Sequence, residues 1–166
     1  MTGIFFGSTT GTTESVAARI AERLGVAQAD VHNVAAASVE DVKKYDLLLL
    51  GSSTWGSGEL QDDWYDGIKV LKNANLSGKT IALFGCGDSE SYSDTFCDGM
   101  GILFEDLKDS GCTFVGAVPD SDYTYASSVA AADGKFVGLA LDDVNESDRT
   151  DARVSAWTEM LKADLA

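Results

Sequence analysis

A dense cluster of hydroxyl side chains follows the first apolar run of the sequence. Residues 8–13 read Ser-Thr-Thr-Gly-Thr-Thr, which places five hydroxyls in six positions. The cluster stands between a continuous apolar run (residues 3–7) and a helical pattern, where free backbone N–H groups and the helix dipole favour an anion. Ordinary turn and cap residues are the simpler interpretation, but one helix cap needs far fewer hydroxyls.

The residue types of this loop narrow the kind of anion. A nucleoside triphosphate loop needs a lysine after its second glycine, and the first lysine of this chain is Lys43. The loop also lacks the Gly-x-Gly-x-x-Gly pattern, which disfavours a dinucleotide pyrophosphate. The protein is acidic, but its charge is spread over the surface and screened beyond roughly 8–10 Å, whereas hydroxyl and amide donors act on an anion at contact distance. The local donors can therefore hold an anion without a lysine or arginine. The loop therefore predicts a site for a single phosphate monoester.

Two further loops carry aromatic side chains. Residues 52–61 contain Trp55 among glycines, and residues 85–94 contain Tyr92. Each follows an apolar run, and an indole or a phenol there could cover a flat ring. Either aromatic alone could equally be a partly buried surface residue. Together, beside a phosphate loop, they favour a flat phosphorylated ligand.

Apolar runs alternate with helical patterns along the chain, and this order must position the three loops. Five such runs predict buried strands, and helical spacing of apolar residues predicts a helix after each. The order predicts a parallel sheet with helices on both faces, whose ligands bind outside the carboxyl ends of the strands. The expected strands cover residues 3–7, 31–34, 47–51, 80–85 and 113–118, and the expected helices cover about 16–24, 38–44, 64–71, 96–107 and 154–161.

Residues 120–145 are extra to this alternation. They include a strand-like run at residues 136–141, ahead of the last helical pattern. We expect an insertion that splits the fifth strand or packs on its edge, and structural padding is its simplest role. The whole chain, residues 1–166, is expected to be one domain, since it has no repeat and no linker.

Composition excludes several classes of protein. The chain has 166 residues, 27 acidic and 12 basic, with a net charge of −15, which disfavours nucleic-acid binding. It shows neither a membrane-spanning run nor a recognisable signal peptide, and its three cysteines lack CxxC spacing, so we expect free thiols in a reducing cytoplasm. The single histidine, His32, is interpreted as an outward strand residue, and we expect neither a metal site nor catalytic residues.

The three loops together resemble those of the flavodoxin family. Residues 8–13 match the flavodoxin phosphate loop, [Thr/Ser]-x-Thr-Gly-x-Thr, and residues 54–64 (TWGSGELQDDW) resemble the second flavin loop. Residues 85–98 resemble the third loop, and residues 133–141 resemble the insertion of long-chain flavodoxins. The resemblance covers nearly the whole chain and departs from the family pattern at Val144, where relatives often carry an acid.

The resemblance implies a three-layer α/β sandwich whose five-stranded parallel sheet has the order 2-1-3-4-5, with helices on both faces and an insertion in the fifth strand. It implies noncovalently bound FMN, with the phosphate held by residues 8–13, the ring between Trp55 and Tyr92, and a redox-linked peptide flip at Gly56-Ser57. Glycine suits such a flip because unusual dihedrals cost it little. The implied cofactor-binding residues are Ser8, Thr9, Thr10, Gly11, Thr12, Thr13, Ser53, Thr54, Trp55, Gly56, Ser57, Gly58, Cys86, Gly87, Asp88, Tyr92 and Cys97.

The resemblance also implies a low-potential electron carrier that shuttles mainly between flavin semiquinone and hydroquinone. Four acids and no base lie between Glu59 and Asp66, and seven acids and one base between Asp88 and Asp109. These charges would disfavour an anionic hydroquinone. They would also steer basic-faced redox partners, such as a flavodoxin or ferredoxin reductase and an electron-accepting enzyme, toward a monomeric carrier. The alternative is an FMN-dependent NAD(P)H or quinone reductase on the same fold. A response-regulator receiver domain is disfavoured, because residues 7–9 lack its acids.

Overall fold

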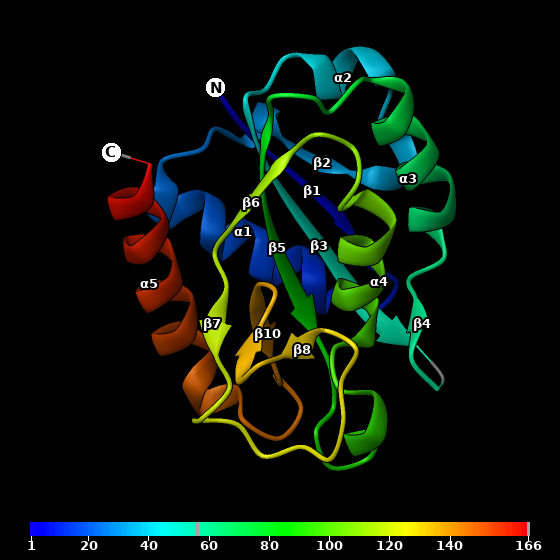
Figure 1. The fold of residues 1–166 in the computed structure, drawn as a ribbon. Coiled ribbons are helices and arrows are strands. Elements are labelled where there is room, and N and C mark those ends of the chain that lie inside the picture. Colours follow the sequence, from blue (N-terminus) through cyan, green and yellow to red (C-terminus); the bar gives the residue numbers. More distant parts are fainter. Residues whose placement is uncertain (56, 166) are drawn as a thin grey trace.

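A parallel sheet forms the centre of the molecule (Figure 1), and the computed structural model describes residues 1–55 and 57–165. The strands follow the spatial order β2-β1-β3-β5, with both β6 and β10 paired to the outer side of β5, and all of these pairings are parallel. This confirms the predicted order 2-1-3-4-5. The strands are β1 (Thr2–Gly7), β2 (Val31–Asn33), β3 (Leu47–Trp55), β5 (Thr80–Cys86), β6 (Thr113–Val115) and β10 (Leu139–Leu141).

Alternating strand residues face two separate cores. Ile4 and Leu49 pack with one pair of helices, α1 (Thr12–Leu24) and α5 (Ser147–Asp164). Phe5 and Leu50 pack on the opposite face with residues of α3 (Asp63–Asn73) and α4 (Asp98–Leu107). The strands are apolar on both faces because helices cover both, as expected for a buried parallel sheet. The three layers predicted from the sequence are therefore confirmed.

Helix ends follow the expected local chemistry. Gly25 ends α1 in a left-handed conformation, with φ 69°. Ser38 caps the short helix α2 (Val39–Lys43) in a reciprocal capping box with Asp41. The three-residue 3₁₀ turns are η1 (Gln28–Asp30), η2 (Val34–Ala36) and η3 (Ser93–Thr95). Val34 thus belongs to η2 rather than to the second strand.

The fifth strand is split by the insertion, which was one of the two expected arrangements. β6 pairs with Thr80–Ala82 of β5, and β10 pairs with Phe84–Cys86. The expected run at residues 113–118 stops at Val115, because Gly116 turns away with φ 88°. The run at residues 136–141 is also two pieces. β9 (Lys135–Phe136) joins β7 (Val118–Pro119) and β8 (Ala131–Ala132) in a small antiparallel sheet.

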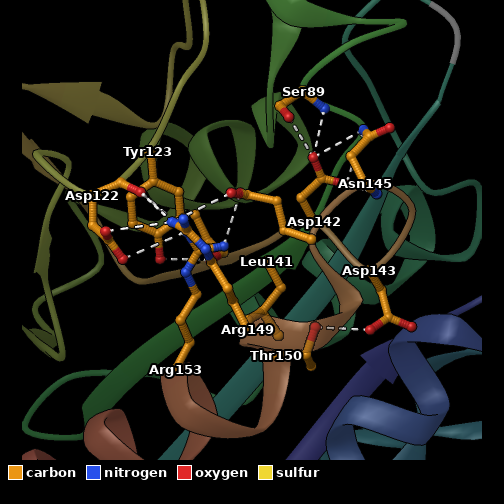
Figure 2. Close-up of polar contacts among 12 residues, drawn as sticks. Ser89, Asp122, Tyr123, Leu141, Asp142, Asp143, Asn145, Arg149, Thr150 and Arg153 are labelled. Carbon is orange, nitrogen blue, oxygen red and sulfur yellow. Dashed lines mark hydrogen bonds and ion pairs between the residues drawn. The ribbon is translucent and has the colours of Figure 1, made fainter.

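Arg153 ties the insertion to α5 (Figure 2). Its side chain is only 8% exposed, and its guanidinium lies 4.0 Å from the centre of the Tyr123 ring. Arg153 also pairs with Glu146 at 3.1 Å and with Asp122 at 3.7 Å. The insertion is therefore packed against the body of the fold.

His32 differs from its expected outward position. Its ring stacks on Phe5 with centroids 4.7 Å apart, and its Nε2 lies 2.7 Å from the Tyr45 hydroxyl. Tyr45 in turn donates to Asp30 at 2.9 Å. The period-2 pattern missed this arrangement because β2 has only three residues and lies at the sheet edge. Among the described helices, none combines the length and apolar character that crossing a membrane requires.

Substitution of Gly138 should destabilise the split strand. A Cβ at this position would lie 2.0 Å from the backbone oxygen of Leu83, which cannot move without disturbing β5. We expect Gly138→Ala to cost roughly 1–3 kcal/mol of unfolding free energy, as overpacking does. Urea denaturation measures this loss.

Gly25→Ala is a comparison variant that isolates backbone strain, because its Cβ would meet open space and only the positive φ is strained. That strain costs about 1–2 kcal/mol. A Gly138→Ala protein as stable as the parent would contradict the close approach of residue 138 to β5.

Candidate functional site

A cavity of about 200 Å³ opens at the carboxyl ends of the central strands. Strand register explains the convergence, since Gly7 pairs with Ser52, Ser52 with Gly85, and Gly85 with Ala140. The loops that follow these four strands therefore leave the sheet side by side. The cavity is lined by Thr10, Thr12, Ser53, Thr54, Trp55, Cys86, Gly87, Asp88, Tyr92, Thr95, Asp143 and Val144.

The first loop presents hydrogen-bond donors at the start of α1. Ser8 Oγ accepts the Gly11 N–H at 3.1 Å, and Gly11 has φ 93° as the residue before the helix. Thr12 and Thr13 form the first turn, whose N–H groups have no acceptor within the helix. Thr13 is fully buried, and its hydroxyl has no hydrogen-bond partner among the described residues. A buried hydroxyl without a partner is costly unless a ligand supplies one.

Thr9, Gly11 and Thr13 do not line the cavity themselves, and neither does Ser8. Thr9 is tied to the second loop instead, because Gln61 Nε2 donates to its hydroxyl at 3.2 Å. Gln61 is 2% exposed and also donates to Asp63. Its positioning role was not predicted, and a glutamine at the end of a loop gives no periodic signal.

The second loop is a tight hairpin rather than an open loop. β3 extends to Trp55 and pairs antiparallel with β4 (Glu59–Leu60), and Gly58 N–H donates to Trp55 O at 3.1 Å. Trp55 is 38% exposed, and its indole N–H donates to Ser53 Oγ at 3.0 Å. Ser57 and Gly58 lie outside the cavity lining. The predicted peptide flip involves Gly56, which lies outside the described residues.

The N-terminus of α4 packs against this hairpin. Gly99 N–H donates to Thr54 Oγ1 at 3.0 Å. Position 58 requires a glycine, because its backbone has φ 97° and a Cβ there would lie 2.6 Å from Asp98 Oδ2. Burial raises the pKa of Asp98, whose other oxygen accepts the Val129 N–H at 2.8 Å. The hairpin, helix α4 and the insertion thus form one packed unit.

The third loop begins after Cys86 and carries Asp88 and Tyr92. Asp88 accepts the N–H groups of Ser91 at 2.9 Å and Glu90 at 3.2 Å, and the Ser91 bond contributes most to lowering the pKa of Asp88. Tyr92 is 51% exposed at the cavity wall. The cavity therefore has an exposed aromatic residue from each of two loops.

Both cysteines of this region are buried. Burial raises the pKa of the Cys86 thiol to about 12 and that of Cys97 well above its usual range. Cys86 lines the cavity, but the Cys97 thiol lies 3.8 Å from the backbone oxygens of Gly85 and Leu141 and does not reach it. All three cysteines are free, as predicted.

Three lining residues were absent from the predicted set: Thr95, Asp143 and Val144. Asp143 and Val144 follow β10, so only the split of the fifth strand brings them to the cavity. Val144 is 70% exposed. No lysine or arginine lines the cavity, and the described residues contain no cluster of metal-binding side chains.

The fold is that of a doubly wound α/β protein, a class whose ligands bind at the carboxyl edge of the sheet, where this cavity lies. The flavodoxin family model matches residues 4–157, and the chain belongs to the flavodoxin family. Flavodoxins carry electrons between redox partners and are not enzymes, so the alternative of a flavin-dependent reductase is not favoured.

Individual relatives match over nearly the full chain. Flavodoxin 1 of Azotobacter vinelandii is 46% identical, covering 98% of this chain and 96% of the relative. Flavodoxin 1 of Escherichia coli K12 is 45% identical, covering 99% and 94%. The crystal structure of Fusobacterium nucleatum flavodoxin bound to flavin mononucleotide is 28% identical, with a TM-score of 0.88 and coverage of 98% and 97%.

Proposed function

We propose that this chain carries electrons on noncovalently bound FMN held in the cavity at the carboxyl edge of the sheet. The observation that carries the proposal is the start of α1 at the cavity, where Thr10 and Thr12 line the wall and the first-turn N–H groups have no acceptor within the helix. A phosphate there would accept hydrogen bonds from these two hydroxyls and from the first N–H groups of the helix. The Fusobacterium nucleatum relative, bound to flavin mononucleotide, supports the choice of ligand.

The rest of the cavity fits the flat part of such a ligand. Trp55 and Tyr92 come from adjacent loops and would cover the two faces of the ring. Gly87 and Asp88 would meet its polar edge. When bound, FMN supplies the ability to accept and release electrons one at a time, and the residues of this chain bind it, orient it and exclude water.

The acidic surface beside the cavity favours a low potential. Glu59 and Asp62 are exposed, and Asp63 is partly buried at the start of α3. Electrons added next to these carboxylates meet repulsion, which is strongest for the step that leaves the cofactor negatively charged. We propose that this chain works mainly through that second, low-potential step.

The same charge defines the partners we propose. A net charge of −15 favours basic-faced redox proteins, such as a flavodoxin or ferredoxin reductase and an electron-accepting enzyme, through electrostatic steering. We propose that the protein works as a single-domain monomer in the cytoplasm and binds neither nucleic acid nor membrane.

Binding of FMN and of riboflavin tests the proposal directly. We expect tight FMN binding and poor riboflavin binding, because riboflavin lacks the phosphate for which the first loop supplies donors. Titration of the apoprotein, followed by quenching of flavin fluorescence, gives both dissociation constants. Equal constants for the two flavins would refute a phosphate site at residues 8–13.

Removal of the Thr10 and Thr13 hydroxyls together tests whether the first loop donates hydrogen bonds to the phosphate. We expect the double variant Thr10→Val, Thr13→Val to lose about 1.5–3 kcal/mol of FMN binding free energy per lost charge-assisted bond. Its affinity for riboflavin should stay nearly unchanged. Valine keeps the shape of threonine, so circular dichroism of the apoprotein should match the parent. Unchanged FMN affinity would mean that these hydroxyls serve only the local structure.

Neutralisation of Glu59, Asp62 and Asp63 to their amides should raise mainly the second one-electron potential, by roughly tens of millivolts. Potentiometry of the FMN-loaded protein measures both potentials. The matched control neutralises Glu40, Asp46 and Asp109, which are exposed acids near the amino ends of the strands. β3 alone spans about 30 Å, far beyond the screening length of roughly 8–10 Å. Equal shifts in the two triple variants would contradict a local field.

A further inference from the structure

Asp142 is a buried carboxylate at the end of β10 that has no ion-pair partner among the described residues. Its side chain is inaccessible to solvent, with 0% exposure. It is surrounded by neutral donors from two segments, and Figure 2 shows Ser89 and Asn145 both directed toward it. Ser89 donates its N–H at 3.0 Å and also its hydroxyl. Asn145 donates its N–H at 3.0 Å and its side-chain amide at 3.0 Å and 3.2 Å.

The hydrogen bonds of Asp142 hold the third loop against the segment after β10, at the point where the pairing of β5 with β10 ends. β10 and β5 are paired up to Leu141 and Cys86, and Gly87 N–H donates to Leu141 O at 2.9 Å. Beyond Gly87 the loop leaves the sheet. The next residues are then held by side chains, because Ser89 is bound by Asp142, 53 positions away in the sequence.

Asn145 extends this attachment to the cavity wall. The same side-chain amide that donates to Asp142 donates to Asp88 Oδ1 at 2.8 Å. Asp88 in turn binds the N–H groups of Glu90 and Ser91, and its backbone oxygen accepts the Tyr92 N–H at 3.0 Å. The conformation of the loop from Asp88 to Tyr92 is therefore tied to one buried carboxylate.

Fold stability alone gives little reason for a carboxylate here. A buried charge without a counter-ion is costly, and the acids nearest in sequence and contact (Asp88, Asp143 and Glu146) have the same sign. Burial opposes ionisation of Asp142, but the hydrogen bonds from Ser89 and Asn145 outweigh it and lower its pKa. Two carboxylate oxygens can accept from both segments at once, whereas an amide has one acceptor oxygen.

We propose that Asp142 is a positioning residue that fixes the third loop, residues 87–92, in the conformation that receives the ring of the flavin. The inference rests on the proposed FMN site and concerns its ring end only. Asp142 does not line the cavity and acts through Ser89, Asn145 and Asp88. Its contribution should therefore be the same for any flavin that places its ring beside Tyr92, with or without a phosphate.

The test compares FMN and riboflavin binding to the apoprotein of Asp142→Asn, Ser89→Ala and the parent. We expect Asp142→Asn to weaken both flavins by the same factor, roughly ten- to a hundredfold. Ser89→Ala keeps the buried charge but removes one of its hydrogen bonds, and it should weaken the binding of both flavins by about two- to tenfold. Circular dichroism in the flavin bands should change in both variants, since the ring environment loosens. Asp151→Asn is the charge-matched control, because Asp151 is 77% exposed on α5 and pairs with Arg19; its affinities should equal those of the parent.

The outcomes separate this inference from the proposed function. Riboflavin affinity at the parent level in Asp142→Asn overturns the inference, whether or not FMN affinity falls. Lower thermal stability of the apoprotein with unchanged flavin affinities also overturns it, since the role would then be structural only. If Asp142→Asn does not fold, Ser89→Ala decides by the same criteria. A parent protein that binds neither flavin overturns the proposed function, and with it this inference.

Discussion

Parallel pairing in one register is the constraint on which the site depends. Because Gly7, Ser52, Gly85 and Ala140 lie in one row across the sheet, the four loops that follow these strands emerge from the same edge. Backbone hydrogen bonds within the sheet fix that row, and two buried cores hold it from both sides. The pairing of the strands therefore brings the four loops together at one edge of the sheet.

Beyond that edge, hydrogen bonds that involve side chains hold the loops in place of the backbone pairing of the sheet. Gln61 links the first loop to the second, the Gly99 N–H of α4 donates to Thr54 of the second, and Asp142 accepts hydrogen bonds from Ser89 of the third. Each link is a hydrogen bond that involves a side chain and joins two segments far apart in the sequence. Such bonds contribute modestly when made but are expensive to leave unmade in a buried place. They select one arrangement of the loops and leave the sheet to supply the bulk of the stability.

The sequence carried enough information for the sheet and much of the cavity. Apolar runs at residues 3–7, 47–51 and 80–85 predict the three central strands, and the density of hydroxyls in residues 8–13 predicts the first loop of the cavity. The split of the fifth strand was harder to locate, because Gly116 and Gly138 act through a turn and a close approach that periodicity does not encode. Gln61 and Asp142 were missed as positioning residues for a similar reason, since their partners lie 52 and 53 positions away.

The split fifth strand also shortens the exposed edge of the sheet. A long exposed edge strand would offer a row of unpaired N–H and C=O groups to another chain. Here one margin of the sheet is β2, with three residues, and the other is shared by β6 and β10, with three residues each. The Tyr123 hydroxyl donates to Ala140 O at 2.8 Å, so the insertion occupies an acceptor of β10. The described sheet therefore offers no long continuous edge for pairing with a strand of another chain, and the insertion interrupts the margin that β6 and β10 share.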